Sequence, residues 1–234
     1  MKSIRLILVA SLLIIMTSNV KAQYLHESWA GLNFYAKENA EYRADKKPVK
    51  AVFIGNSITQ MWKYARPDFW KDNDYVCRGI SGQTTPQMLS RFRPDVVELY
   101  PQVVVIHGGI NDIAWNTGAY DFEYTLGCIK SMAEIARANG IQVVIASMLP
   151  STEFPWRKEI TGVAAKVAQL NGAMKEYCQK EGFTYLDYFS ALVLNDGSQS
   201  MSKELTTDGV HVTPAGYEIM EKTVIPVVEK LLKK

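Results

Sequence analysis

Four short clusters of small and polar residues supply the groups that acyl transfer needs. They are Gly55-Asn56-Ser57-Ile58-Thr59, Gly79-Ile80-Ser81-Gly82-Gln83-Thr84-Thr85, Gly108-Gly109-Ile110-Asn111-Asp112 and Asp208-Gly209-Val210-His211. A serine hydroxyl becomes a useful nucleophile only when a base removes its proton. Ser57 and His211 are the candidates for nucleophile and base. A single cluster of this kind is more typical of an ordinary turn or helix cap than of an active site, so the inference depends on their joint occurrence.

The fourth cluster pairs an acid with the candidate base. An aspartate three residues before a histidine can bend back to the Nδ1 atom of the ring, as Asp208 can toward His211. The contact would fix the tautomer and leave Nε2 free to accept a proton. Thr213 as a helix cap and Pro214 at the first helical position would anchor this loop to the last helix.

The second and third clusters offer hydrogen-bond donors for an oxyanion. Glycine in the second cluster, above all Gly82, lets the backbone approach a ligand closely. Asn111 in the third cluster carries a neutral amide donor, which suits the stabilisation of a tetrahedral intermediate. The four clusters together therefore provide a candidate for every role in serine-based acyl transfer.

The elements that must position these clusters alternate along the chain. Short apolar runs predict five buried strands at 49–54, 75–78, 103–107, 142–147 and 184–186. Helical patterns occupy 29–42, 86–92, 122–139, 162–180 and 214–232. Pro226 is expected to bend or interrupt the last helix. This alternation predicts a three-layer α/β/α sandwich with a five-stranded parallel sheet of flavodoxin-like type, whose reactive groups lie at the carboxyl ends of the strands.

The four clusters resemble those of the SGNH (GDSL-like) hydrolases, which are named after a serine, a glycine, an asparagine and a histidine. Ser57, Gly82, Asn111 and His211 match those four residues. The resemblance implies the three-layer fold, attack by Ser57 on an acyl carbonyl, proton transfer to His211 and orientation of that histidine by Asp208. It also implies an oxyanion hole made by the backbone N–H groups of Ser57 and Gly82 and the Asn111 amide, with no cofactor or metal.

Within this family the sequence is most similar to the branch of platelet-activating-factor acetylhydrolase-like proteins and secreted bacterial acetylesterases. Two residues depart from the family pattern. Asn56 stands where an aspartate usually precedes the nucleophile, which is expected to alter local hydrogen bonding without removing the triad. His107 stands where an apolar residue is more usual, and it either lines the pocket or packs under the end of the sheet.

The first 22 residues have the pattern of a cleaved secretory signal peptide. Lys2 and Arg5 precede an apolar run over 6–16, and small residues end at Ala22. An uncleaved anchor is the alternative, but the run is short for a bilayer. We expect cleavage after Ala22, a single catalytic domain over 23–234, and a secreted or periplasmic protein without a membrane span in the mature chain.

The charge of the mature chain argues against polyanionic partners. The leader holds three of the 26 basic residues and none of the 24 acidic ones, so its removal leaves a net charge of −1. Such a protein has no electrostatic reason to bind nucleic acid or an anionic membrane. The three cysteines, Cys77, Cys128 and Cys178, lie in apolar or helical stretches and are either buried thiols or include one disulfide.

Aromatic residues near the strand ends bear on the substrate. Trp62, Trp115 and Trp156 either stack on sugar rings or pack the loops over the sheet, and His107 is a fourth candidate for contact with substrate. Together with secretion, they favour deacetylation of O-acetylated carbohydrate. The alternatives are a lysophospholipase or general short-chain lipid esterase, and a non-catalytic carbohydrate-binding protein on the same scaffold.

Overall fold

The computed structural model describes residues 29–45 and 49–233. The predicted signal peptide and its cleavage site lie outside the described residues, so export stays a prediction. Among the residues described, no helix has the length and apolar character needed to cross a membrane. All three cysteines, Cys77, Cys128 and Cys178, are buried free thiols.

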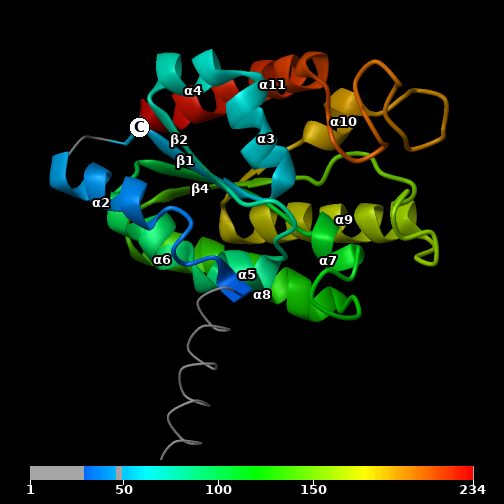
Figure 1. The fold of residues 1–234 in the computed structure, drawn as a ribbon, viewed down its shortest axis with the longest axis horizontal. Coiled ribbons are helices and arrows are strands. Elements are labelled where there is room, and N and C mark those ends of the chain that lie inside the picture. Colours follow the sequence, from blue (N-terminus) through cyan, green and yellow to red (C-terminus); the bar gives the residue numbers. More distant parts are fainter. Residues whose placement is uncertain (1–28, 46–48, 234) are drawn as a thin grey trace, which may run out of the picture.

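A five-stranded parallel sheet forms the middle layer (Figure 1). Its strands lie in the order β2-β1-β3-β4-β5, as expected for a flavodoxin-like arrangement. The strands are β1 (Ala51–Gly55), β2 (Tyr75–Gly79), β3 (Val103–His107), β4 (Gln142–Ala146) and β5 (Thr184–Leu186). Strands β1, β2 and β3 are buried along their whole length, which explains why they are continuous apolar runs.

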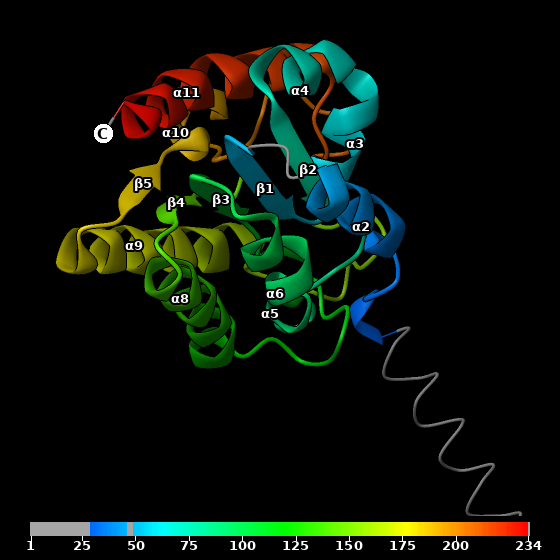
Figure 2. The same ribbon diagram turned by 90° about the vertical axis from the view of Figure 1, so that its left-hand side faces the viewer.

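Helices cover both faces of the sheet, which confirms the predicted three-layer sandwich (Figure 2). One face carries α3 (Ser57–Ala65), α4 (Pro67–Asn73), α10 (Tyr188–Leu192) and α11 (Pro214–Leu232). The other carries α2 (Ala36–Asp45), α5 (Thr85–Ser90), α6 (Phe92–Asp95), α8 (Phe122–Ala138) and α9 (Val163–Glu181). The short helices η1 (Val97–Leu99) and α7 (Ile110–Ile113) flank β3.

The carboxyl ends of the three central strands lie in register. Gly55 of β1 pairs with Gly79 of β2 on one side and with His107 of β3 on the other. The first turn of α3 packs so closely over these ends that a Cβ atom on Gly79 would lie 2.3 Å from the backbone nitrogen of Gln60. Glycine is therefore required at this strand end, and three of the four predicted clusters begin side by side.

Two details of the helix predictions were wrong. The expected helix at 29–42 is broken, because residues 29–30 are helical, residues 31–35 form turns in which Gly31 has a φ of 65°, and α2 begins at Ala36. Helix α11 covers the predicted 214–232 and continues through Pro226, so the expected interruption does not occur. Proline removes one backbone hydrogen bond, and Pro226 lies on the exposed side of α11, where water can satisfy the freed carbonyl group.

An aromatic cluster joins α3, α4 and α11 to the sheet. Trp62 stacks on Phe69 and on Tyr217 at centroid distances of 4.6 and 5.4 Å, and its Nε1–H donates to Glu221. Only 1% of Trp62 is exposed. Of the two sequence alternatives for Trp62, contact with substrate is therefore wrong and packing is confirmed, because the ring is part of the core beneath the helix that carries Ser57.

We predict that Phe69→Ala lowers the free energy of unfolding by about 3–5 kcal/mol, because it removes a buried aromatic ring and leaves a cavity. Chemical denaturation measures this loss. Tyr64→Ala is the control, because 73% of Tyr64 is exposed, and we expect its effect to stay within about 0.5 kcal/mol. Equal losses in the two variants would contradict the packing described here.

Candidate active site

Ser57 is the first residue of α3, directly after the turn that leaves β1. The preceding Asn56 caps this helix, since its Oδ1 accepts a hydrogen bond from the Ile58 N–H at 3.1 Å. The N–H of Ser57 has no carbonyl partner inside the helix and lies at its positive end. The local sequence thus presents both the hydroxyl and the N–H of Ser57 at the carboxyl edge of the sheet.

The loop before α11 brings His211 to this serine. Ser57 Oγ and His211 Nε2 are 2.8 Å apart, and His211 Nδ1 lies 2.7 Å from Asp208 Oδ2. Backbone contacts fix the loop, because the His211 carbonyl accepts hydrogen bonds from the Thr206 hydroxyl and the Thr207 N–H. Residues that are 154 positions apart in the sequence therefore form one hydrogen-bonded chain of serine, histidine and aspartate.

Asp208 also folds back on its own loop. Its Oδ1 accepts hydrogen bonds from the N–H groups of Val210 and His211, at 2.9 and 2.8 Å. Partial burial would raise the pKa of Asp208, but these hydrogen bonds and the contact with the His211 ring outweigh it and lower the pKa below its usual value. The Asp208 carboxylate is therefore ionised at neutral pH and can accept a hydrogen bond from His211 Nδ1.

The two further donors predicted for an oxyanion, Asn111 and Gly82, lie on the segments that follow β3 and β2. Asn111 lies in α7, and its Nδ2 donates to the carbonyl of Gln83 at 2.9 Å. An amide carries two N–H bonds, so this contact orients the group and leaves the second N–H for a ligand. Gly82 has a φ of 77°, which favours glycine, and the Asn116 amide donates to its carbonyl. The second and third clusters thus hold each other in place.

Asp112, a buried residue of α7, also connects the segments that follow β2 and β3, a role that sequence reasoning missed. Its carboxylate accepts hydrogen bonds from the backbone N–H and the hydroxyl of Thr85. Burial raises the pKa of Asp112 to about 6, although the contacts from Thr85 and Thr125 oppose the rise. The Asn-Asp pair in the third cluster suggested only a turn, because a contact across 27 residues leaves no local pattern.

The side chain of His107 is 5% exposed and packs edge-on against Tyr188, at a centroid distance of 5.7 Å. Both sequence alternatives apply in part, because the buried ring packs under the end of the sheet and also lines a small closed space beside Asn56 and Ile58. Burial lowers the pKa of His107 to about 4, so its ring is neutral at neutral pH. His107 therefore does not compete with His211 as the base beside Ser57.

Trp156 and Trp115 differ from Trp62 because both are accessible. The Trp156 ring is 47% exposed and lies beside the His211 ring, with a centroid distance of 6.1 Å. Trp115 is 36% exposed and has a φ of 59°, an unusual backbone conformation for a bulky residue. Arg157 donates to the carbonyl of Trp115 at 3.2 Å and joins the two loops.

The space beside the turn that leads from β1 to Ser57 (residues 55–57, the nucleophile turn) is small and has no room for a water molecule. Apolar and polar residues close around it: Asn56, Ile58, His107, Gly108, Ile110, Met148, Leu149, Ser151 and Val210. A separate cavity of about 390 Å³ beside β2 includes no residue of the Ser57–His211–Asp208 chain in its lining. Its position excludes it as the site of the chemistry, although it is the larger of the two.

The arrangement can perform nucleophilic acyl transfer. Imidazole Nε2 lies within hydrogen-bonding reach of the serine hydroxyl, which is the geometry that a general base requires. The acid is ionised and bound to the opposite ring nitrogen. The predicted oxyanion donors Ser57, Gly82 and Asn111 lie on the segments that follow the carboxyl ends of β1, β2 and β3.

Residues 53–219 match the model of the GDSL-like lipase/acylhydrolase family. This range begins in β1 and ends in α11, so it includes Ser57, Asp208 and His211.

Similar proteins agree with the family match. A putative acylhydrolase from Bacteroides fragilis is 43% identical, with a TM-score of 0.83 over 87% of this chain and 98% of that one. A GDSL-like lipase from Bacteroides thetaiotaomicron is also 43% identical, with a TM-score of 0.80 over 86% and 98%. The human isoamyl acetate-hydrolyzing esterase 1 homolog is 25% identical over 77% of this chain and 82% of that protein.

The lowered pKa of His107 predicts a pH-dependent stability. The folded protein keeps this ring neutral down to about pH 4, whereas a histidine in the unfolded chain binds a proton near pH 6.5. Between these two pH values the unfolded chain therefore binds a proton that the folded protein does not, so acidification lowers the free energy of unfolding. Between pH 7 and 4.5, we expect the wild type to lose roughly 2–3 kcal/mol more than His107→Leu in urea unfolding. The raised pKa of Asp112 acts in the opposite direction but is common to both proteins. Equal losses would mean that His107 is solvated in the folded state.

Proposed function

Because the chain belongs to the GDSL-like lipase/acylhydrolase family and is a carboxylic ester hydrolase, we propose that it removes acetyl groups from carbohydrate through an acyl-enzyme on Ser57. The hydrogen-bonded chain from Ser57 through His211 to Asp208 is the observation that carries this proposal. A non-catalytic binding protein on the same scaffold would have no use for this geometry.

In the first half of the proposed reaction, Ser57 Oγ attacks the ester carbonyl carbon while His211 Nε2 takes the hydroxyl proton. The ionised Asp208 stabilises the imidazolium that forms. The carbonyl oxygen becomes an oxyanion, which the N–H groups of Ser57 and Gly82 and the amide of Asn111 stabilise. Loss of one such donor typically costs about two to three orders of magnitude in rate.

Collapse of this intermediate expels the alcohol, which receives its proton from His211, and leaves the acyl group on Ser57. In the second half, His211 takes a proton from water, and the resulting nucleophile attacks the acyl-enzyme. The same donors stabilise the second oxyanion, and release of the acid restores the Ser57 hydroxyl. All proton transfers pass through the single imidazole that lies 2.8 Å from Ser57 Oγ.

A short acyl group is supported by the name of a relative. The human relative is named for hydrolysis of isoamyl acetate, an acetyl ester. The space beside the nucleophile turn, whose wall includes Ile58, Ile110 and Val210, offers no cavity for a long acyl chain. Both observations favour acetyl over long-chain acyl esters.

The alcohol side of the ester is where carbohydrate would bind. The accessible face of Trp156, beside His211, is flat and apolar and suits the face of a sugar ring. Trp115, from the loop that follows Asn111, would border the same region. An apolar alcohol would also suit these rings, so a general short-chain lipid esterase is the second candidate, which the named substrate of the human relative favours.

We also propose that the protein is exported. The basic start, the apolar run and the small residues that end at Ala22 support cleavage of a signal peptide there. An exported esterase would meet extracellular or periplasmic glycans, which is consistent with the proposed substrate class.

Ser57→Ala is predicted to abolish hydrolysis of p-nitrophenyl acetate above the background rate, because the acyl-enzyme cannot form. Initial rates of the purified wild type and variant, with matched circular dichroism spectra, measure this. Ser81→Ala is the control, because it removes a nearby exposed hydroxyl that is bound to Gln60 and not to the histidine. Matching rates for Ser57→Ala and the wild type would refute the enzyme mechanism.

Acetylated glycans distinguish the substrate classes. We expect acetate release from acetylated xylo-oligosaccharides, and Trp156→Ala should raise KM for them roughly three- to tenfold, equivalent to about 1 kcal/mol of lost stacking. KM for ethyl acetate, whose alcohol is too small to stack, should not change. Tyr124→Ala, which removes an exposed ring on α8, is the control. Activity confined to long-chain acyl lipids would exclude the carbohydrate proposal.

A further inference from the structure

Arg91 forms hydrogen bonds with two segments whose relative position matters for the proposed mechanism, the one before Ser57 and the one after Gly82. Its side chain is fully buried between α5 and α6. Nη2 donates to the carbonyl of Gly55 at 2.9 Å, Nε donates to Gln83 Oε1 at 2.6 Å, and Nη1 donates to Asp95 at 2.8 Å. Each of the three donor directions of the guanidinium therefore ends on a different segment.

The Gly55 contact acts on the nucleophile. Gly55 is the last residue of β1, two positions before Ser57, and its carbonyl also accepts the N–H of Ile80 at 3.1 Å. Arg91 and Ile80 therefore meet at one carbonyl group, at the point where the chain leaves the sheet toward Ser57. A shift of this peptide would move the serine hydroxyl relative to the donors on the neighbouring loops.

The Gln83 contact acts on the oxyanion donors. Gln83 follows Gly82, and its backbone carbonyl accepts the Asn111 amide at 2.9 Å. Its side-chain amide accepts from Arg91 and donates to the carbonyl of Ala30, a fully buried residue of the segment before α2. Gln83 is thus held on three sides, and Arg91 supplies one of them.

We propose that Arg91 is a positioning residue that sets the distance between the nucleophile turn (residues 55–57) and the oxyanion loop (residues 80–84). The proposal rests on the function assigned above. Arg91 touches neither substrate nor reacting atoms; it acts through the Gly55 carbonyl and the Gln83 side chain.

A guanidinium suits this role better than an ammonium group. Arg presents five N–H donors in a rigid planar fork, whereas Lys presents three donors on a single nitrogen atom. A lysine cannot reach Gly55, Gln83 and Asp95 along three fixed directions. Asp95 supplies the counter-charge and is itself held by the Asn39 amide at 2.6 Å.

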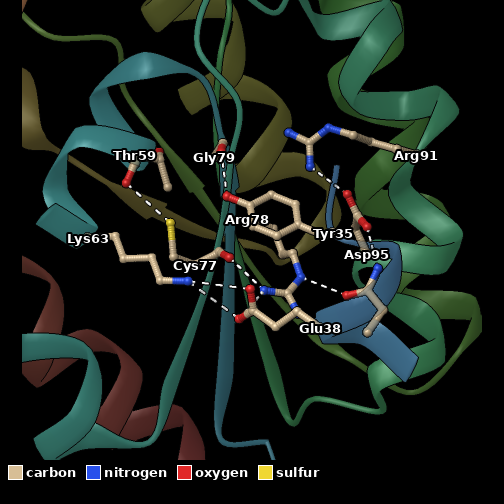
Figure 3. A network of polar contacts seen from close by, with 10 residues as sticks. Tyr35, Glu38, Thr59, Lys63, Cys77, Arg78, Gly79, Arg91 and Asp95 are labelled. Carbon is tan, nitrogen blue, oxygen red and sulfur yellow. Dashed lines mark hydrogen bonds and ion pairs between the residues drawn. The ribbon is translucent and has the colours of Figure 1, made fainter. Parts of the chain in front are cut away.

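The neighbouring Arg78 is a matched control in the same buried network (Figure 3). Its side chain is also fully buried and donates to Asn39, to Glu38 and to the carbonyl of Cys77. None of these partners belongs to the nucleophile turn or the oxyanion loop. Arg78 and Arg91 belong to one network, because the Asn39 side chain accepts from Arg78 and donates to Asp95, which accepts from Arg91 (Figure 3). A Lys substitution at either position therefore perturbs that network.

The test compares Arg91→Lys with Arg78→Lys in the full chain. Active sites are counted by titration with a p-nitrophenyl phosphonate, and kcat is expressed per titrated site. Methylboronic acid, which forms a tetrahedral adduct with an active-site serine, probes the oxyanion hole. We expect Arg91→Lys to lower kcat per site roughly 10- to 100-fold and to raise the methylboronic acid Ki by the same factor, with KM little changed. Arg78→Lys should lower the unfolding midpoint but keep the wild-type kcat and Ki.

Gln83→Met keeps the test decisive if Arg91→Lys does not fold, because it removes the Arg91 contact without removing a buried charge. It should also lower kcat per site and raise the boronic acid Ki. The proposal is overturned if Arg91→Lys or Gln83→Met keeps the wild-type kcat per site and the wild-type boronic acid Ki. A reduced number of titratable sites alone would show that Arg91 has a purely structural role. Full activity of Ser57→Ala would instead refute the proposed function, independently of Arg91.

Discussion

The carboxyl ends of β1, β2 and β3 lie in one row, with Gly55 paired to Gly79 on one side and to His107 on the other. This register brings together loops that are far apart in the sequence. Ser57, Gly82 and Asn111 each follow one of these strand ends within a few residues. Because parallel strands covered on both faces cannot slip without exposing their apolar side chains, the stability of the sheet also fixes the geometry of the site.

Much of this arrangement could be predicted from the sequence. The apolar runs predicted five parallel strands, and the clusters that follow three of them predicted the sheet edge that carries Ser57 and Asn111. The Asp208–His211 contact was also predictable, since a carboxylate and a ring three residues apart form a local pattern. What spacing could not supply was the contact across 154 residues that brings His211 to Ser57, which depends on how α11 packs against α3.

The residues that sequence reasoning missed act through distant contacts. The sequence left Trp62 open between substrate contact and packing, because only the packing of α3, α4 and α11 decides that its ring is covered. Asp112 and Arg91 form buried hydrogen bonds across chain separations that leave no periodic signal. The accessible Trp156, by contrast, lies beside His211 although nothing in its local sequence distinguishes it from Trp62.

The central claim is that Ser57 carries the acyl group, and covalent labelling tests it most directly. The wild-type protein would be inactivated with a p-nitrophenyl phosphonate, digested, and its peptides analysed by mass spectrometry. We expect one phosphonyl group per chain, on Ser57, with loss of activity in proportion to labelling and no labelling in His211→Ala. Complete inactivation with the label on another residue, or full labelling of Ser57 with activity retained, would contradict the account.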